Sequence, residues 1–279
     1  MTVADSRLSA LRRRFRAVAA VGLVICAAAV VLSDCSKSSA DAPAPLFVFA
    51  GQSNMVGQGS MGMPLPPDLS RPRANELFWV NETRAWSTTP PLPNGLYGPE
   101  VSAMRRLATR LDGTALAVKE AVSGTALATV WDPSRTDGLY AAMRSAVNDA
   151  LGSRIRGIAP PHVAAFFWMQ GESDGQDLTM GGNYAANLRH LIDQVRSDFG
   201  SPHLPVVLGR IRAENPTASP QGLALVRSAI DRVAAATLDV RVVNTDDLPL
   251  AADGLHFTGP GLITLGGRFA DAYLAMSHS

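Results

Sequence analysis

The segment Leu46–Gly57, LFVFAGQSNMVG, contains the pattern on which the predicted fold rests. Its first five residues are apolar, so both faces of a strand formed by them would be buried, as in a parallel sheet that helices cover on both sides. Gly51 permits a sharp turn at the strand end, and a helix is expected to begin just after it. Ser53 lies in that turn, where its hydroxyl is exposed and its backbone N–H can bind an anion. A serine in this position is either a helix N-cap or a nucleophile that requires a neighbouring base.

Strand-like and helical signals alternate along the rest of the chain. This alternation over one domain predicts an α/β fold, a three-layer sandwich of the flavodoxin-like type with a central parallel sheet of roughly five strands. The proline-rich and polar segment Ser60–Pro93 is predicted to be a long surface excursion. The predicted strands are Leu46–Ala50, Ala115–Ala121, His162–Met169, Leu204–Arg210 and Val240–Val243. Four helices are predicted: one that begins at Pro99, one over Tyr184–Phe199, one that begins at Ser219-Pro220 and one that begins at Thr258-Gly259-Pro260.

The first 42 residues are predicted to be a signal peptide or another N-terminal export segment, and residues 43–279 to be one folded domain. Basic residues 12–16 precede the apolar stretch Ala17–Leu32, and small residues suited to signal peptidase cleavage follow around Ala40. We therefore expect an exported protein, secreted or located in the periplasm or cell envelope. A retained N-terminal membrane anchor is the alternative, and a twin-arginine or lipoprotein signal is favoured only weakly.

The composition excludes several classes of protein. Of 279 residues, 47% are hydrophobic and 18% are charged, which is typical of a globular domain. The first forty residues hold six basic and two acidic residues, so the remainder carries 19 basic and 22 acidic ones, and nucleic acid is not an expected partner. Cys26 and Cys35 both precede the predicted domain, which therefore has no disulfide, thiol nucleophile or cysteine-based metal site.

Asp253 and His256 form the clearest base for a serine nucleophile. Three residues separate them in a predicted turn just before the last helix, so the carboxylate can hold Nδ1 of the imidazole and leave Nε2 for the nucleophile. Of the five histidines, His256 alone has a carboxylate three residues before it in a turn at the expected carboxyl end of the sheet. The alternative is a surface histidine in a polar loop.

Two further strand ends carry candidate hydrogen-bond donors. Gln170 follows a hydrophobic strand, and a carboxamide there can donate to a developing oxyanion or make structural hydrogen bonds. Gly124 follows another strand, and its backbone N–H is a candidate second donor, although a simple tight turn fits equally well. Glu172 and Asp174 are weak evidence for a glycosidase pair or a metal site, because no histidine lies near them in sequence.

Three segments together resemble a known family. AGQSNMVG (50–57), WMQGESD (168–174) and DGLHFTGPG (253–261), in this order and spacing, look like the sialate O-acetylesterase and plant-type acetylxylan esterase branch of the SGNH (GDSL-like) hydrolases. The resemblance covers about residues 46–276 and implies an SGNH-type esterase domain over 43–279. It implies an enzyme that removes O-acetyl groups from a carbohydrate, of the sialic acid or xylan type, through an acetyl-enzyme. No metal or other cofactor is expected, because the domain has no cysteine and no histidine pair at ligand spacing.

The resemblance also assigns roles to residues. It implies Ser53 as the nucleophile, His256 as the base and Asp253 as its partner. The backbone N–H groups of Ser53 and Gly124 and the side chain of Gln170 would form the oxyanion hole. A lipase-like or thioesterase-like SGNH hydrolase, and a catalytically inactive carbohydrate-binding relative, are the alternatives. An α/β-hydrolase is disfavoured because Ser53 lacks the Gly-x-Ser-x-Gly context.

Overall fold

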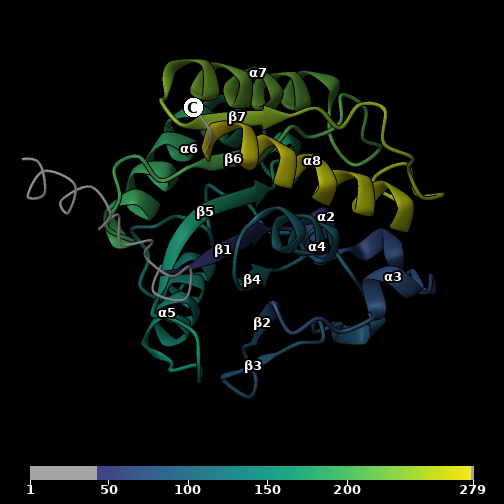
Figure 1. Cartoon of the computed structure of the whole chain (residues 1–279). Helices are drawn as coiled ribbons and strands as arrows, with labels where there is room; N and C mark the ends of the chain where they lie inside the picture. The colour runs from purple at the N-terminus through teal and green to yellow at the C-terminus, as the bar shows by residue number, and fades with distance from the viewer. Residues whose placement is uncertain (1–42, 278–279) are drawn as a thin grey trace, which may run out of the picture. The chain divides into compact units, whose positions relative to one another are not determined.

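The computed structural model describes residues 43–277. The predicted export segment and both cysteines lie outside the described residues. The described part is built on one seven-stranded sheet with strand order β3-β2-β4-β1-β5-β6-β7 (Figure 1). Only the β2–β3 pair is antiparallel. The strands are β1 (Ala44–Gly51), β2 (Glu76–Val80), β3 (Ala85–Ser87), β4 (Ala115–Ala121), β5 (Pro161–Met169), β6 (Val206–Gly209) and β7 (Val240–Val243).

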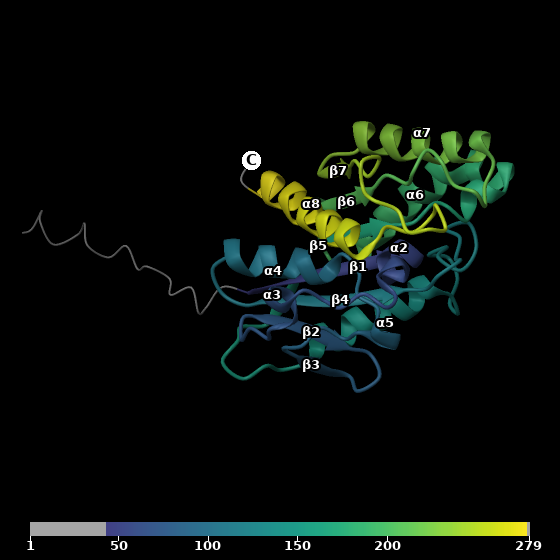
Figure 2. The same cartoon turned by 90° about the vertical axis from the view of Figure 1, so that its right-hand side faces the viewer.

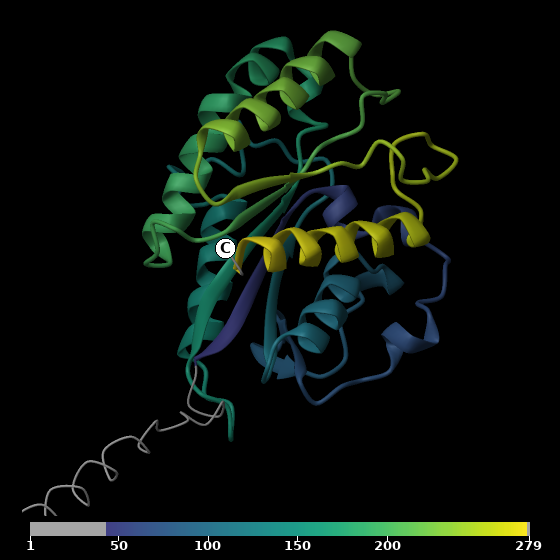
Figure 3. The same ribbon diagram turned by 45° about the horizontal axis from the view of Figure 1, so that its top comes forward.

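Helices cover both faces of the sheet. After β1 the chain passes to β2, turns back in β3, and then returns to β4 beside β1. Strands β5, β6 and β7 follow in order on the other side of β1. Helices α4 and α8 pack side by side on one face (Figures 2 and 3), and α6 packs against α7 on the other. The long helices are α4 (Glu100–Arg110), α5 (Leu139–Gly152), α6 (Leu178–Asp198), α7 (Pro220–Ala236) and α8 (Gly259–Ser277).

The core follows from the apolar central strands. Phe47, Phe49 and Phe167 on β1 and β5 are fully buried. The rings of Phe49 and Phe167 stack with centroids 4.7 Å apart, and Phe269 of α8 packs against Phe167 at 5.5 Å. Burial of aromatic rings on this scale dominates the stability of a domain this size. The α/β three-layer fold predicted from the sequence is confirmed.

The prediction for Ser60–Pro93 was wrong in part. This segment contains β2 and β3, which extend the sheet from the expected five strands to seven. Leu77, Phe78 and Trp79 of β2 are buried. β2 is short and is flanked by prolines and polar residues, so its sequence alone does not indicate a buried strand. Its side chains become buried because β2 pairs with β4 in the sheet.

Helix α5 was also missed, although its sequence carries a helical signal. Tyr140, Met143, Val147 and Ala150 recur at intervals of three and four residues and are all fully buried. The four predicted helices are present with boundaries close to those expected. Among residues 43–277, no helix combines the length and the apolar character that crossing a membrane requires.

The register of the three central strands brings the sequence motifs to one edge. Gly51, the last residue of β1, pairs with Ala121 of β4 on one side and with Met169 of β5 on the other. Gly51 has φ of +151°, and a Cβ atom there would lie 2.1 Å from the carbonyl oxygen of Met169. A glycine is therefore required where the chain leaves the sheet, and the segments that follow β1, β4 and β5 begin side by side.

Candidate active site

Ser53 is the first residue of a single helical turn, α2 (Ser53–Val56), two residues after the end of β1. The carbonyl oxygen of Gln52 accepts hydrogen bonds from the N–H groups of Met55 and Val56 at 2.7 and 2.8 Å, and this closes the turn. The Ser53 residue is 5% exposed. Within residues 43–277 the Ser53 N–H has no acceptor, so it is available to an oxygen atom of a ligand.

Asp253 and His256 form a pair within one turn before α8. Asp253 Oδ2 lies 2.6 Å from His256 Nδ1, and Asp253 Oδ1 accepts the N–H groups of Leu255 and His256 at 2.9 and 3.0 Å. Partial burial of the Asp253 carboxylate opposes ionisation, but the backbone N–H groups of His256 and Leu255 and the imidazole outweigh it and lower the pKa of Asp253 to about 2. The carboxylate therefore holds Nδ1 and directs Nε2 away from itself.

Asn54, the residue after Ser53, connects the serine turn to the histidine turn. Its Oδ1 atom accepts the N–H of Phe257 at 2.9 Å, and its Nδ2 atom donates to the carbonyl oxygen of Leu255 at 3.5 Å. These bonds hold the neighbours of Ser53 and His256 together across more than 200 residues of chain. Ser53 Oγ and His256 make no direct hydrogen bond in this structure, an arrangement common in substrate-free serine hydrolases, whose catalytic hydrogen bonds tighten on binding.

Glu172 lies beneath Ser53 and is 4% exposed. Its Oε2 atom accepts the amide of Gln52 at 2.6 Å, and its Oε1 atom accepts the amide of Asn54 at 2.9 Å. Burial raises the pKa of Glu172, and hydrogen bonds from Asn54 and Gln52 together with the charge of His256 oppose this rise. Because both oxygens accept from amide donors, the hydrogen bonds are those of the ionised carboxylate.

Gln170 is fully buried at the end of β5, and its amide has protein partners for both N–H groups. Nε2 donates to the carbonyl oxygen of Thr125 at 2.9 Å and to Asp174 Oδ2 at 2.7 Å. The Tyr184 hydroxyl donates to Gln170 Oε1 at 3.0 Å. Gln52 Oε1 is a third, more distant acceptor at 3.5 Å. The predicted oxyanion role of Gln170 therefore stays a prediction, and it requires that a substrate oxygen replace one of these acceptors.

Gly124 lies in the loop that Gln170 and Asp174 hold. It has φ of +72° and an exposed backbone. Asp174 accepts the N–H groups of Leu127 and Ala128 at 2.8 and 3.0 Å and so anchors the loop after β4. Among the described residues the Gly124 N–H has no acceptor, which leaves it free, like that of Ser53.

Glu172 and Asp174 do not form a carboxylate pair. Each is occupied by separate amide or backbone donors. In the described part of the chain, no group of three or more His, Cys, Asp and Glu side chains is placed to hold a metal ion.

Sequence reasoning missed the amides of Gln52 and Asn54 and the buried carboxylate of Glu172 that joins them. All three residues lie in the GQSN and QGE segments quoted above, but their side chains meet across about 120 positions of sequence.

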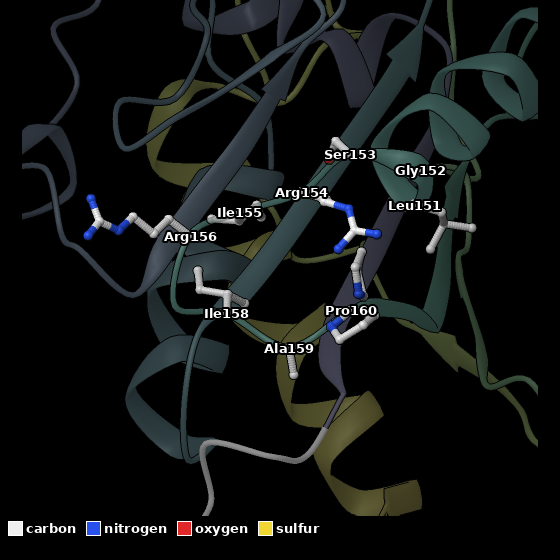
Figure 4. A pocket seen from close by; sticks show the side chains of 10 residues that line it. Leu151, Gly152, Ser153, Arg154, Ile155, Arg156, Ile158, Ala159 and Pro160 are labelled. Carbon is white, nitrogen blue, oxygen red and sulfur yellow. The ribbon is translucent and has the colours of Figure 1, made fainter.

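A cavity of about 530 Å³, lined by residues 151–156 and 158–161, lies at the opposite end of β5 (Figure 4). In Figure 4 Arg156 points away from the other lining side chains, and no residue of the site reaches this cavity.

The fold and the serine turn place the chain among the SGNH-type hydrolases. Residues 43–275 match the family model described as SASA, carbohydrate esterase, sialic acid-specific acetylesterase. The chain belongs to this carbohydrate esterase family, and it is a carboxylic ester hydrolase that acts on carbohydrate acetyl groups.

Individual relatives agree with this assignment. A probable carbohydrate esterase of Arabidopsis thaliana is 28% identical over 260 residues, which cover 84% of this chain and 91% of the relative. An X-ray structure of an Arabidopsis thaliana protein superposes with a TM-score of 0.72 at 25% identity and covers 84% of this chain and 99% of its own. The crystal structure of NanS has a TM-score of 0.65 at 16% identity over 85% of this chain and 99% of its own, and shows the same fold.

We predict that Glu172→Gln lowers kcat by roughly 10- to 100-fold, because small displacements of reacting groups cost about that much. In the variant, the amide group of the new glutamine would face the amide N–H groups of Gln52 and Asn54. One of these would then meet an N–H group where the wild-type protein has a carboxylate oxygen, and the turn of Ser53 would shift. Steady-state kinetics on an aryl acetate measures the effect, and Glu214→Gln, at an exposed position, is the matched control. Wild-type kcat in a Glu172→Gln protein of native stability would contradict this role.

Proposed function

We propose that the chain hydrolyses O-acetyl esters on a carbohydrate through a Ser53–His256–Asp253 triad and an acetyl-enzyme intermediate. The observation that carries the proposal is the Asn54 bridge, which holds the Asp253–His256 pair against the turn of Ser53. Family membership supports the substrate class, and the local geometry supports the residue roles.

Each half of the proposed reaction uses the same groups in opposite order. Ser53 Oγ attacks the acetyl carbonyl while His256 Nε2 takes its proton, and Asp253 stabilises the imidazolium from the Nδ1 side. The tetrahedral intermediate collapses when the sugar oxygen leaves with that proton, and the acetyl group stays on Ser53. Water then attacks the acetyl-enzyme, gives its proton to His256, and releases acetate as the Ser53 hydroxyl is regenerated.

The proposed oxyanion hole combines two backbone donors and one side chain. The N–H groups of Ser53 and Gly124 have no protein acceptor in the described residues and are free to bind the oxyanion. Gln170 completes the hole by exchanging its bond to Thr125 for the substrate oxygen.

We also propose that the enzyme acts outside the cytoplasm, on the basis of the N-terminal sequence.

Ser53→Ala is expected to abolish acetate release while the fold remains intact, because loss of a triad nucleophile costs on the order of 10⁴-fold or more. Acetate release from an aryl acetate and from an acetylated sugar measures the effect, and circular dichroism checks the fold. A fluorophosphonate should label wild-type Ser53 stoichiometrically and leave the variant unlabelled. Near-wild-type activity of the variant, or no labelling of an active wild-type enzyme, would refute Ser53 as the nucleophile.

Gln170→Ala is expected to lower kcat more than it raises KM, by roughly 10²- to 10³-fold, because an oxyanion donor acts mainly in the transition state. Gln176→Ala, at an exposed position six residues further along, is the matched control. An effect confined to KM would mean that Gln170 binds substrate instead. Thermal unfolding of both variants separates this effect from loss of the Thr125 and Asp174 hydrogen bonds.

The rate is expected to rise with pH between about pH 5 and 8, since only neutral His256 can accept the proton of Ser53. Asp253, with its pKa of about 2, stays ionised over that whole range. Asp253 should therefore contribute no ionisation to the profile of kcat/KM between about pH 5 and 8. A flat profile between about pH 5 and 8 with chemistry limiting would exclude His256 as the base.

A further inference from the structure

A second cavity lies beside the proposed catalytic serine. Its volume is about 480 Å³, and Val56, the last residue of α2, forms part of its wall. It opens at the carboxyl end of β4, whose last residue, Ala121, pairs with Gly51 two positions before Ser53. The cavity is therefore one strand away from the nucleophile turn, on the side of β2.

The cavity wall combines an apolar surface with hydrogen-bonding groups. Trp79 of β2 is held by an edge-to-face contact with Trp86, with centroids 5.2 Å apart. Pro91, Leu92 and Pro93 also line the cavity. A largely preformed pocket with an apolar wall and a few polar groups is typical of a site for a small organic ligand.

The polar groups of the wall are mainly acidic. Glu82 and Glu120 both line the cavity, and Asn81 Nδ2 donates to Glu120 Oε2 at 3.2 Å. Burial, together with the charge of Glu82, raises the pKa of Glu120, in agreement with two carboxylates that face the same space.

The cation of the cavity wall is already neutralised. Lys119 is the single basic residue in the wall, within the described part of the chain. Its Nζ atom forms a 2.8 Å ion pair with the buried carboxylate of Glu100 and donates to the carbonyl oxygen of Val56 at 3.1 Å. The wall therefore presents two carboxylates and no unpaired positive charge to a ligand.

We propose that this cavity binds the sugar that carries the acetyl ester, and that Glu82 and Glu120 make the enzyme specific for uncharged sugars. The hydroxyl groups of a neutral sugar can donate to the two carboxylates, and the more exposed Leu92 and Pro93 can pack against its apolar face. An O-acetyl sialic acid carries an ionised carboxylate, which would meet two like charges without a cation to pair with. The proposal rests on the proposed function and narrows its substrate class to neutral acetylated sugars.

The test compares three esters on wild-type enzyme: an aryl acetate, a neutral acetylated xylo-oligosaccharide and an O-acetyl sialic acid. We expect kcat/KM for the neutral sugar to exceed that for the sialic acid by about tenfold or more, because like charges across an interface disfavour the wrong partner. Raising the ionic strength from about 0.02 M to about 0.5 M should narrow this ratio, since salt screens partly exposed charges.

Variants assign the discrimination to the two carboxylates. The double variant Glu82→Gln and Glu120→Gln should reduce the neutral-to-anionic ratio by about tenfold, and circular dichroism checks that the variant is folded. The matched control is Asp112→Asn, which removes an exposed carboxylate three residues before β4, the strand that carries Glu120. This control should leave the neutral-to-anionic ratio unchanged.

The outcomes separate this proposal from the proposed function. A wild-type enzyme that cleaves aryl acetate but prefers the sialic acid would overturn the cavity assignment alone. An unchanged ratio in the folded double variant would overturn it as well. If wild-type enzyme cleaves none of the three esters, the proposed function fails and this proposal fails with it.

Discussion

The geometry of the active site depends on one buried carboxylate, that of Glu172. It accepts hydrogen bonds from the residues on either side of Ser53, and one of these, Asn54, also binds the backbone beside His256. Three segments that follow β1, β5 and β7 are thereby joined at a single point. A buried carboxylate is costly unless its hydrogen bonds are satisfied, and here each oxygen has an amide donor. The same interaction that satisfies the charge therefore fixes the turn that carries Ser53.

The carboxylates around Ser53 lie on two sides of it. Glu172 and Asp253 lie on the side of His256, and Glu82 and Glu120 line the cavity on the side of β2. Negative groups stabilise the imidazolium that forms during acyl transfer. The proposed preference for a neutral sugar rests on Glu82 and Glu120 alone, although the description of the family names sialic acid.

Much of the fold could be predicted from local patterns. The strands β1, β4, β5, β6 and β7 are short apolar runs. The four predicted helices have periodic stripes, and three of them have proline or glycine at their starts. Strand β2 was missed because ELFWV at Glu76–Val80 lies among prolines and polar residues, and only pairing with β4 reveals it as part of the sheet. Helix α5 was missed although its buried apolar residues are periodic.

Ser53 after a strand and glycine, and Asp253 three residues before His256, are local arrangements, so the sequence by itself determined both. Each depends on contacts within one turn, and backbone geometry makes such contacts predictable. The tertiary structure alone decided which groups support them. Gln52 and Asn54 meet Glu172 across about 120 residues, and the amide of Gln170, expected to face substrate, is committed to Thr125 and Asp174. Long-range hydrogen bonds of this kind depend on how strand ends align, and no local pattern encodes that alignment.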